Sequence, residues 1–91
     1  MSNLLFGYDL NKSGQDYSGL IAEIYKTFPT YWHCLDSTWI VSTDWSPAQL
    51  RDWLWSQMDA NDEVFVVDIT GKAAAWEGFK DVCQTWLVSN L

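Results

Sequence analysis

Apolar residues recur along this chain with two different periods, which predicts an alternation of strands and helices. A short apolar run that begins at Leu4 stops abruptly at Asp9, and turn-forming residues follow it. This pattern is typical of a buried strand that ends in a loop. We therefore expect Asp9 to lie at the end of the first strand, within reach of solvent.

The next segment changes to a helical period. Asp16 can cap a helix whose apolar stripe consists of Tyr17, Leu20, Ile21, Ile24 and Phe28, and Pro29 then ends it. Two short β-prone runs follow, at residues 31–35 and 38–42, and Asp36-Ser37 separates them. Two residues of turn chemistry between such runs predict a tight antiparallel hairpin.

A second helix has a clear start signal. Ser46 is the expected N-cap, Pro47 takes the first helical position and Gln49 completes a capping box, while Trp45 can pack onto Leu50. The expected core stripe is Leu50, Trp53, Leu54 and Met58. Trp55 falls off this stripe, so we expect it at an interface and not in the core.

The last third of the chain predicts a strand and a helix. Residues 59–63 form a polar turn, residues 64–69 read as a strand with apolar side chains on both faces, and Thr70-Gly71 breaks it. From about Ala73 we expect a helix with one apolar face. That face consists of Trp76, Phe79, Cys83, Trp86 and Leu87.

The predicted order is β-α-β-β-α-β with an added C-terminal helix. The handedness of crossover connections leaves few ways to assemble this order, and an α+β ferredoxin-like sandwich in one domain over residues 1–91 is the natural solution. Two main helices cover only one face of such a sheet. The other face needs the C-terminal helix or a second subunit, and we therefore expect a homodimer formed through the sheet.

Composition adds three expectations. Seven tryptophans and an aromatic share of 16% indicate a packed fold and not a disordered chain. No apolar stretch is long enough to span a bilayer, so we expect no membrane partner and a cytoplasmic location. Cys34 and Cys83 have no ligand-spaced neighbour, and we interpret them as reduced core thiols, with a disulfide as the alternative.

Acidity is the strongest compositional feature. The formal net charge is −7, and the five basic residues are scattered singly. Proteins that neutralise phosphate backbones need clustered Lys and Arg, so this composition argues against that mode of nucleic-acid binding. The excess acid either maintains solubility or provides a surface that mimics nucleic acid or engages a basic partner.

Several other residues are weighed as site candidates. His33 is the only histidine, and a lone strand histidine is more often packed or hydrogen-bonded than a catalytic base. Asp59, Asp62 and Glu63 lack the spacing and glycine of a calcium loop, which favours a solvated turn. Trp55 and Trp45 could stack on bases or anchor a protein partner.

A family resemblance is carried by three groups of residues. They are Tyr8-Asp9-Leu10-Asn11 with Gly14-Gln15-Asp16-Tyr17, Trp32-His33 with Leu35-Asp36-Ser37-Thr38-Trp39, and Asn61-Asp62 before the last strand. Together they resemble a small bacterial family labelled SinR-like, which is unrelated to the sporulation regulator of that name. Strand one ending in Tyr8-Asp9 is also similar to the smaller CRISPR adaptation protein and to virulence-associated protein D.

The resemblance implies symmetric dimers in which the strand-one aspartates of two subunits can hold a divalent metal, with nuclease activity in some members and an architectural role in others. Asp9 is the residue that carries over, with Mg²⁺ or Mn²⁺ as the implied ion. Lys12 is the one cation close to Asp9 in sequence. Two functions follow: a metal-dependent endonuclease acting on RNA or DNA, or a non-catalytic homodimer that binds a protein or a nucleotide. The negative net charge of the chain favours the non-catalytic homodimer over the endonuclease.

Overall fold

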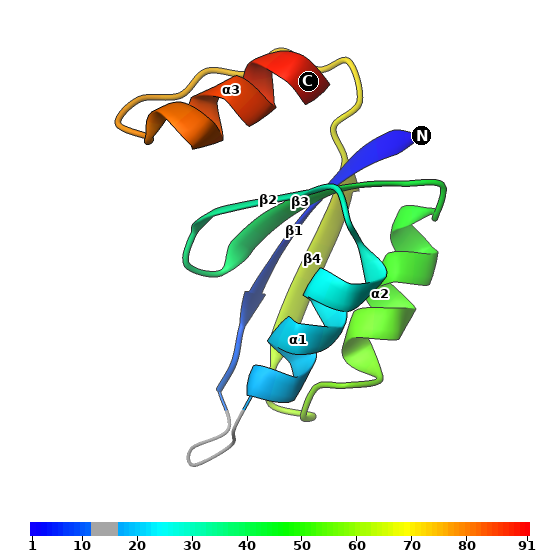
Figure 1. Cartoon of the computed structure of the whole chain (residues 1–91). Coiled ribbons are helices and arrows are strands. Elements are labelled where there is room, and N and C mark those ends of the chain that lie inside the picture. Colours follow the sequence, from blue (N-terminus) through cyan, green and yellow to red (C-terminus); the bar gives the residue numbers. More distant parts are fainter. Residues whose placement is uncertain (12–16) are drawn as a thin grey trace.

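A computed structural model of the chain describes residues 1–11 and 17–91. The elements are β1 (Ser2–Asp9), α1 (Ser18–Thr27), β2 (Tyr31–Leu35), β3 (Thr38–Thr43), α2 (Pro47–Trp55), β4 (Glu63–Asp68) and α3 (Asp81–Asn90). The four strands form one antiparallel sheet in the order β2-β3-β1-β4. Figure 1 shows α1 and α2 on one face of this sheet and α3 on the other. The protein is therefore an α+β fold with three layers.

The main core lies between the sheet and the pair α1 and α2. Strand alternation places Leu4, Phe6 and Tyr8 of β1 in this layer, and α1 contributes Leu20 and Ile24. The remaining buried members are Phe28, Trp39, Val41, Leu50 and Leu54. Burial of these large side chains away from water is the main stabilising term for a domain of this size.

Local sequence signals fix the hairpin and the second helix. β2 and β3 pair antiparallel across a turn at Asp36-Ser37, as predicted. Ser46 Oγ accepts from the Gln49 backbone N–H at 3.1 Å, and Gln49 Oε1 accepts from the Ser46 N–H at 2.8 Å, so the predicted capping box is present. The helix α1 begins at Ser18 with Tyr17 in the N-cap position, and the expected cap Asp16 lies outside the described residues.

The prediction of a helix from Ala73 is wrong, because α3 begins only at Asp81. Residues 71–80 form an irregular segment in which both Gly71 and Gly78 have positive φ, at 68° and 82°. A left-handed residue at Gly78 interrupts a right-handed helix, which explains the late start. Trp76 and Phe79 nevertheless pack in the second apolar cluster, as the apolar pattern suggested.

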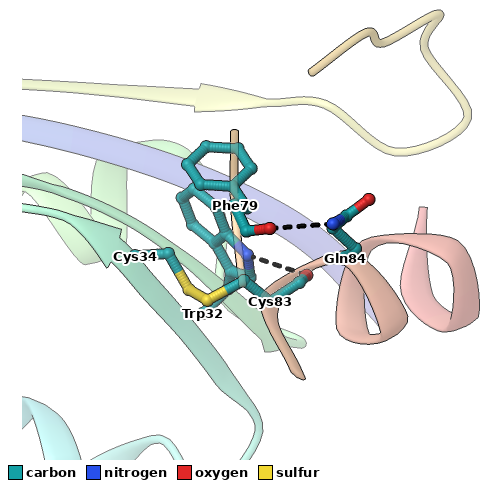
Figure 2. The surroundings of a disulfide bond; sticks show 5 residues. All are labelled: Trp32, Cys34, Phe79, Cys83 and Gln84. Atoms are coloured by element: carbon teal, nitrogen blue, oxygen red, sulfur yellow. Dashed lines mark hydrogen bonds between the residues drawn. A yellow bond between two sulfur atoms is a disulfide. The ribbon is translucent and has the colours of Figure 1, made fainter. Parts of the chain in front are cut away.

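The interpretation of the cysteines as reduced thiols is also wrong. Cys34 on β2 and Cys83 on α3 form a disulfide, with a Cα–Cα distance of 6.4 Å. Figure 2 shows this bond beside Trp32, whose indole N–H donates to the Cys83 carbonyl oxygen at 3.2 Å. The two cysteines are 49 residues apart, so no local sequence pattern indicates that they pair.

The turn at residues 59–63 is not fully solvated as predicted, because Asp62 is only 4% exposed. Its carboxylate accepts from the Tyr17 hydroxyl at 2.8 Å and from the backbone N–H groups of Asn11 and Asp59, each at 2.7 Å. A buried carboxylate requires such donors. Asp62 thus joins the end of β1, the start of α1 and the turn before β4.

Candidate functional site

A shallow hollow of about 370 Å³ opens on the sheet where β1 ends. Its lining comes from β1, from the β2–β3 turn and from the start of β4: Gly7, Tyr8, Asp9, Ser37, Thr38, Glu63, Val64 and Phe65. The turn is fixed to β1 because the Tyr8 backbone N–H donates to the Ser37 carbonyl oxygen at 3.1 Å. The exposed Asp9 lies at the end of β1, as the sequence predicted.

The floor of this hollow is open because Gly7 has no side chain. A Cβ placed on Gly7 would lie 3.7 Å from the Ser37 carbonyl oxygen, which is an ordinary van der Waals contact. The backbone would therefore accept a side chain at this position, and the glycine leaves the space above it open. Phe65 stands directly opposite Gly7 on β4 and is 67% exposed. Phe65 is thus a large apolar side chain that the fold leaves mostly exposed to solvent.

Two carboxylates meet at the rim of the hollow. Asp9 and Glu63 are cross-strand partners, so their side chains lie on the same face of the sheet. No described Lys or Arg lines this hollow, and Lys12 lies outside the described residues. Within residues 1–11 and 17–91, no group of three or more His, Cys, Asp or Glu is arranged to hold a metal ion. The rim is therefore acidic and attracts cations in preference to phosphates.

The outer side of β4 is the second part of the site. The Ile69 N–H donates to the Asn3 carbonyl oxygen at 2.9 Å, and the alternation of an antiparallel ladder then directs the backbone groups of Val67 and Phe65 toward β1. The backbone groups of Val64 and Val66 point outward, because β4 is an edge strand.

The helix α2 flanks this outer edge. Pro47, Ala48 and Arg51 line a hollow of about 370 Å³ together with Val64, Phe65 and Val66. Trp55 lies one helical turn beyond Arg51 on the same side of α2 and is 44% exposed. The predicted position of Trp55 outside the core is thus confirmed. We refer to the exposed β4 edge, Phe65, Arg51 and Trp55 as the β4 surface.

The other candidate residues are placed elsewhere. The His33 ring stacks on Trp39 with 3.6 Å between ring centroids, and His33 Nε2 lies 2.9 Å from the Asp36 carbonyl oxygen. A carbonyl oxygen only accepts, so Nε2 carries the proton in this arrangement. The Trp45 ring packs edge-on against Phe28 and Trp53. Neither residue lines the hollow beside Asp9.

Tyr8 and Asp68 both have shifted pKa values, and both shifts keep the ordinary charge state of the side chain at neutral pH. Burial raises the pKa of the Tyr8 phenol, against a smaller lowering by the hydrogen bond from Trp39. The Thr70 hydroxyl and then the Thr70 backbone N–H lower the pKa of the Asp68 carboxyl. Tyr8 thus remains protonated and Asp68 ionised, so neither is poised to exchange a proton near pH 7.

Sequence reasoning found Asp9 and Trp55 but missed Glu63 and Phe65. Both missed residues follow from the pairing of β4 with β1, which places Glu63 opposite Asp9 and Phe65 opposite Gly7. The pairing with β1 places the Phe65 side chain on the face of the sheet that carries α3, and its exposure depends on how far α3 covers that face. The register between two strands and the covering of a sheet face by a helix are tertiary properties. The only sign of them in the sequence is that the strand at residues 64–69 has apolar side chains on both faces.

Comparison with known proteins adds no relative. No protein-family model matches this chain, and no curated protein and no solved structure matches it. None of the helices in the described part of the chain has the length and apolar character needed to cross a bilayer.

Proposed function

We propose that this protein is a non-catalytic homodimeric interaction protein with a ferredoxin-like fold, of the SinR-like kind that its sequence resembles. The order of elements and the sheet order β2-β3-β1-β4 support the ferredoxin-like assignment. The observation that carries the function is the β4 surface, where an unpaired strand edge and the exposed Phe65 occur together. Proteins normally shield such edges, so an apolar one favours a pairing partner.

The partner at this edge is a second copy of the chain. If two β4 strands pair antiparallel about Val66, the outward backbone groups of Val66 meet those of its symmetry mate, and Val64 meets Asp68. Phe65 then lies beside the partner's Val67, which covers the exposed ring. This register also separates Glu63 from the partner's acidic strand residues. Two four-stranded sheets would join into one continuous sheet.

The acidic charge of the chain affects both the salt dependence of this dimer and the kind of partner that the dimer can bind. Each chain carries a formal net charge of −7, so two copies repel each other, and dissolved salt should reduce that repulsion. The dimer brings two acidic rims of Asp9 and Glu63 into one assembly. Such a surface favours a basic protein over a nucleotide, because no described cation lines the hollow to receive a phosphate.

Light scattering behind a sizing column should report twice the mass of one chain for the wild type, and more dimer as salt is raised.

Val66→Pro should give a monomer, because proline removes an outward N–H without touching the ladder to β1. Phe65→Lys should do the same through charge and lost apolar contact. Trp55→Ala should weaken the dimer while costing well under 3–5 kcal/mol of stability, the typical loss for a buried aromatic.

Two variants serve as matched controls for this experiment. Val67→Pro removes an N–H that points toward β1, so it should unfold the edge and not merely separate subunits. Trp53→Ala, whose partly buried ring packs against Phe28 at 5.5 Å, should lose more stability than Trp55→Ala without a separate effect on association. A wild-type chain that stays monomeric at high protein and salt concentration would exclude the β4 dimer.

A second function is favoured by one observation, the cross-strand pairing of Asp9 with Glu63 at a strand end. Their oxygen donors fit the preference of Mg²⁺ or Mn²⁺ for carboxylates and water, and a twofold axis could bring two such pairs together. A bound ion of this kind supplies an activated water for phosphodiester hydrolysis. This would make the protein a metal-dependent endonuclease.

Asp9→Asn separates the two functions. If the protein is a nuclease, this variant should abolish cleavage of RNA or DNA in Mg²⁺ or Mn²⁺, and calorimetry should show that ion binding is lost with it. Circular dichroism should be unchanged, since the Asp9 side chain is exposed and the variant keeps the backbone that pairs with Glu63. The proposed interaction function instead expects no metal-dependent cleavage by wild type and normal dimerisation of Asp9→Asn.

A further inference from the structure

In addition to the main chain, the disulfide links α3 covalently to the sheet. Cys34 belongs to the edge strand β2, and Cys83 is the third residue of α3. Besides this bond, the Trp32 indole N–H donates to the Cys83 carbonyl oxygen, and the Asn3 side-chain amide donates to the Asn90 carbonyl oxygen. One end of α3 is therefore tied by the disulfide and the other by Asn3 (Figure 2 shows the first).

Solvent reaches this disulfide from two sides. One hollow of about 380 Å³ lies toward Leu35 and Phe79, and another of about 400 Å³ lies toward Tyr25 and Trp86. Both are lined by His33, Cys34, Lys80 and Cys83. Cys34 is half-buried, whereas Cys83 is 9% exposed. A small thiol can thus approach the bond, and it meets the Cys34 sulfur more readily than that of Cys83.

The two sulfurs also differ as leaving groups. Cys83 lies in the first turn of the ten-residue helix α3, and the amide dipoles of a helix N-terminus stabilise a thiolate there. Lys80 lines the same hollows, and its positive charge acts in the same direction, while Asp36 and Asp81 act against it. Cys34 lies on a strand and has no helix dipole. Displacement of the Cys83 thiolate is therefore the favoured direction of exchange.

Opening the bond would release an apolar surface. Beneath α3 and the segment before it, a hollow of about 300 Å³ is lined mainly by apolar side chains, among them Leu5, Ile40, Ile69, Trp76 and Leu87. The cluster that holds α3 has only four buried members, which is small beside the main core: Trp32, Ile40, Cys83 and Leu87. The helix α3 therefore has a smaller buried apolar contact with the sheet than the pair α1 and α2, and the disulfide adds a covalent bond to that contact.

We propose that the Cys34–Cys83 disulfide is a thiol-exchange site through which a dithiol reductant releases the first turn of α3 from the sheet. A thiolate of the reductant attacks Cys34 Sγ, the sulfur–sulfur bond breaks, and Cys83 leaves as a thiolate. The second thiol of the reductant then attacks its own sulfur in the mixed disulfide and frees Cys34. The reductant ends as a disulfide, and its two electrons and two protons end on the cysteine pair.

The test measures bond opening and α3 release separately in the folded, full-length chain. The protein is incubated with dithiothreitol or glutathione without denaturant, free thiols are alkylated, and peptide masses are mapped. We expect the bond to open under native conditions and the glutathione adduct to appear on Cys34. Amide hydrogen exchange should accelerate about tenfold or more in α3 and remain unchanged in β1 and β3.

A double variant, Cys34→Ser with Cys83→Ser, gives the released state without a reductant. Its α3 amides should exchange as fast as those of the reduced wild type, with β1 and β3 still protected. Reduction that requires denaturant, an adduct confined to Cys83, or α3 amides that stay protected after reduction would each overturn the proposal. Loss of protection in β1 and β3 as well would show that the disulfide is a general structural brace.

Discussion

Replacing Trp39 by alanine should lower the free energy of unfolding by about 3–5 kcal/mol, a range typical for emptying a buried aromatic site. Trp39 is fully buried, and its ring lies 6.0 Å from Phe6, 5.2 Å from Tyr25 and 3.6 Å from His33 between centroids. A domain of this size is stable by only about 5–15 kcal/mol, so the variant should be close to unfolding. Urea titration followed by circular dichroism measures the loss.

Trp39→Phe is the matched variant. It keeps most of the ring contacts but removes the indole N–H, which donates to the Tyr8 hydroxyl at 3.0 Å. We expect a smaller loss of about 1–3 kcal/mol, the cost of leaving a buried polar group without its partner. A loss below about 1 kcal/mol for Trp39→Ala would mean that the aromatic cluster is not the centre of the core.

Asp62→Ala should also be strongly destabilising, by about 2–4 kcal/mol, because several donors lose a charged acceptor at once. The Tyr17 hydroxyl and the backbone N–H groups of Asn11 and Asp59 all donate to this carboxylate. The same urea titration measures the effect. Proteolysis should show new cleavage near the end of β1 and the turn before β4, since both are fixed through Asp62.

Asp44→Ala provides the control for charge. It removes one negative charge from a chain of net charge −7, as Asp62→Ala does, but Asp44 is exposed and pairs only loosely with the N-terminal ammonium at 3.8 Å. We expect a change within about 0.5 kcal/mol. Equal behaviour of the two variants would show that the Asp62 hydrogen bonds contribute little.

Local signals made much of this fold predictable. The hairpin at Asp36-Ser37 and the cap at Ser46 depend on residues within a few positions of each other, and the structure has both. The start of α3 was not predictable in this way, because an apolar stripe from Trp76 to Leu87 also fits an irregular segment that packs on a sheet. The left-handed conformation of Gly78 decides between them.

The candidate site was predictable only in part, and for a related reason. Asp9 follows from the end of an apolar run, and Trp55 follows from the helical period of its neighbours. The burial of Asp62 and the disulfide of Cys34 with Cys83 both join segments far apart in sequence. Such contacts depend on the arrangement of whole elements, which no local pattern specifies.

The position of β1 inside the sheet has a consequence for the order of assembly. As the chain is synthesised, β1 can pair with β3 once residue 43 has been made, but its other edge must wait for β4, where Asp68 pairs with Leu4. Until then the apolar strand presents an open edge to any neighbouring chain. Contacts between such distant residues also form slowly. The pairing of β4 with β1, which completes the sheet, is therefore a late step in the folding of each newly synthesised chain.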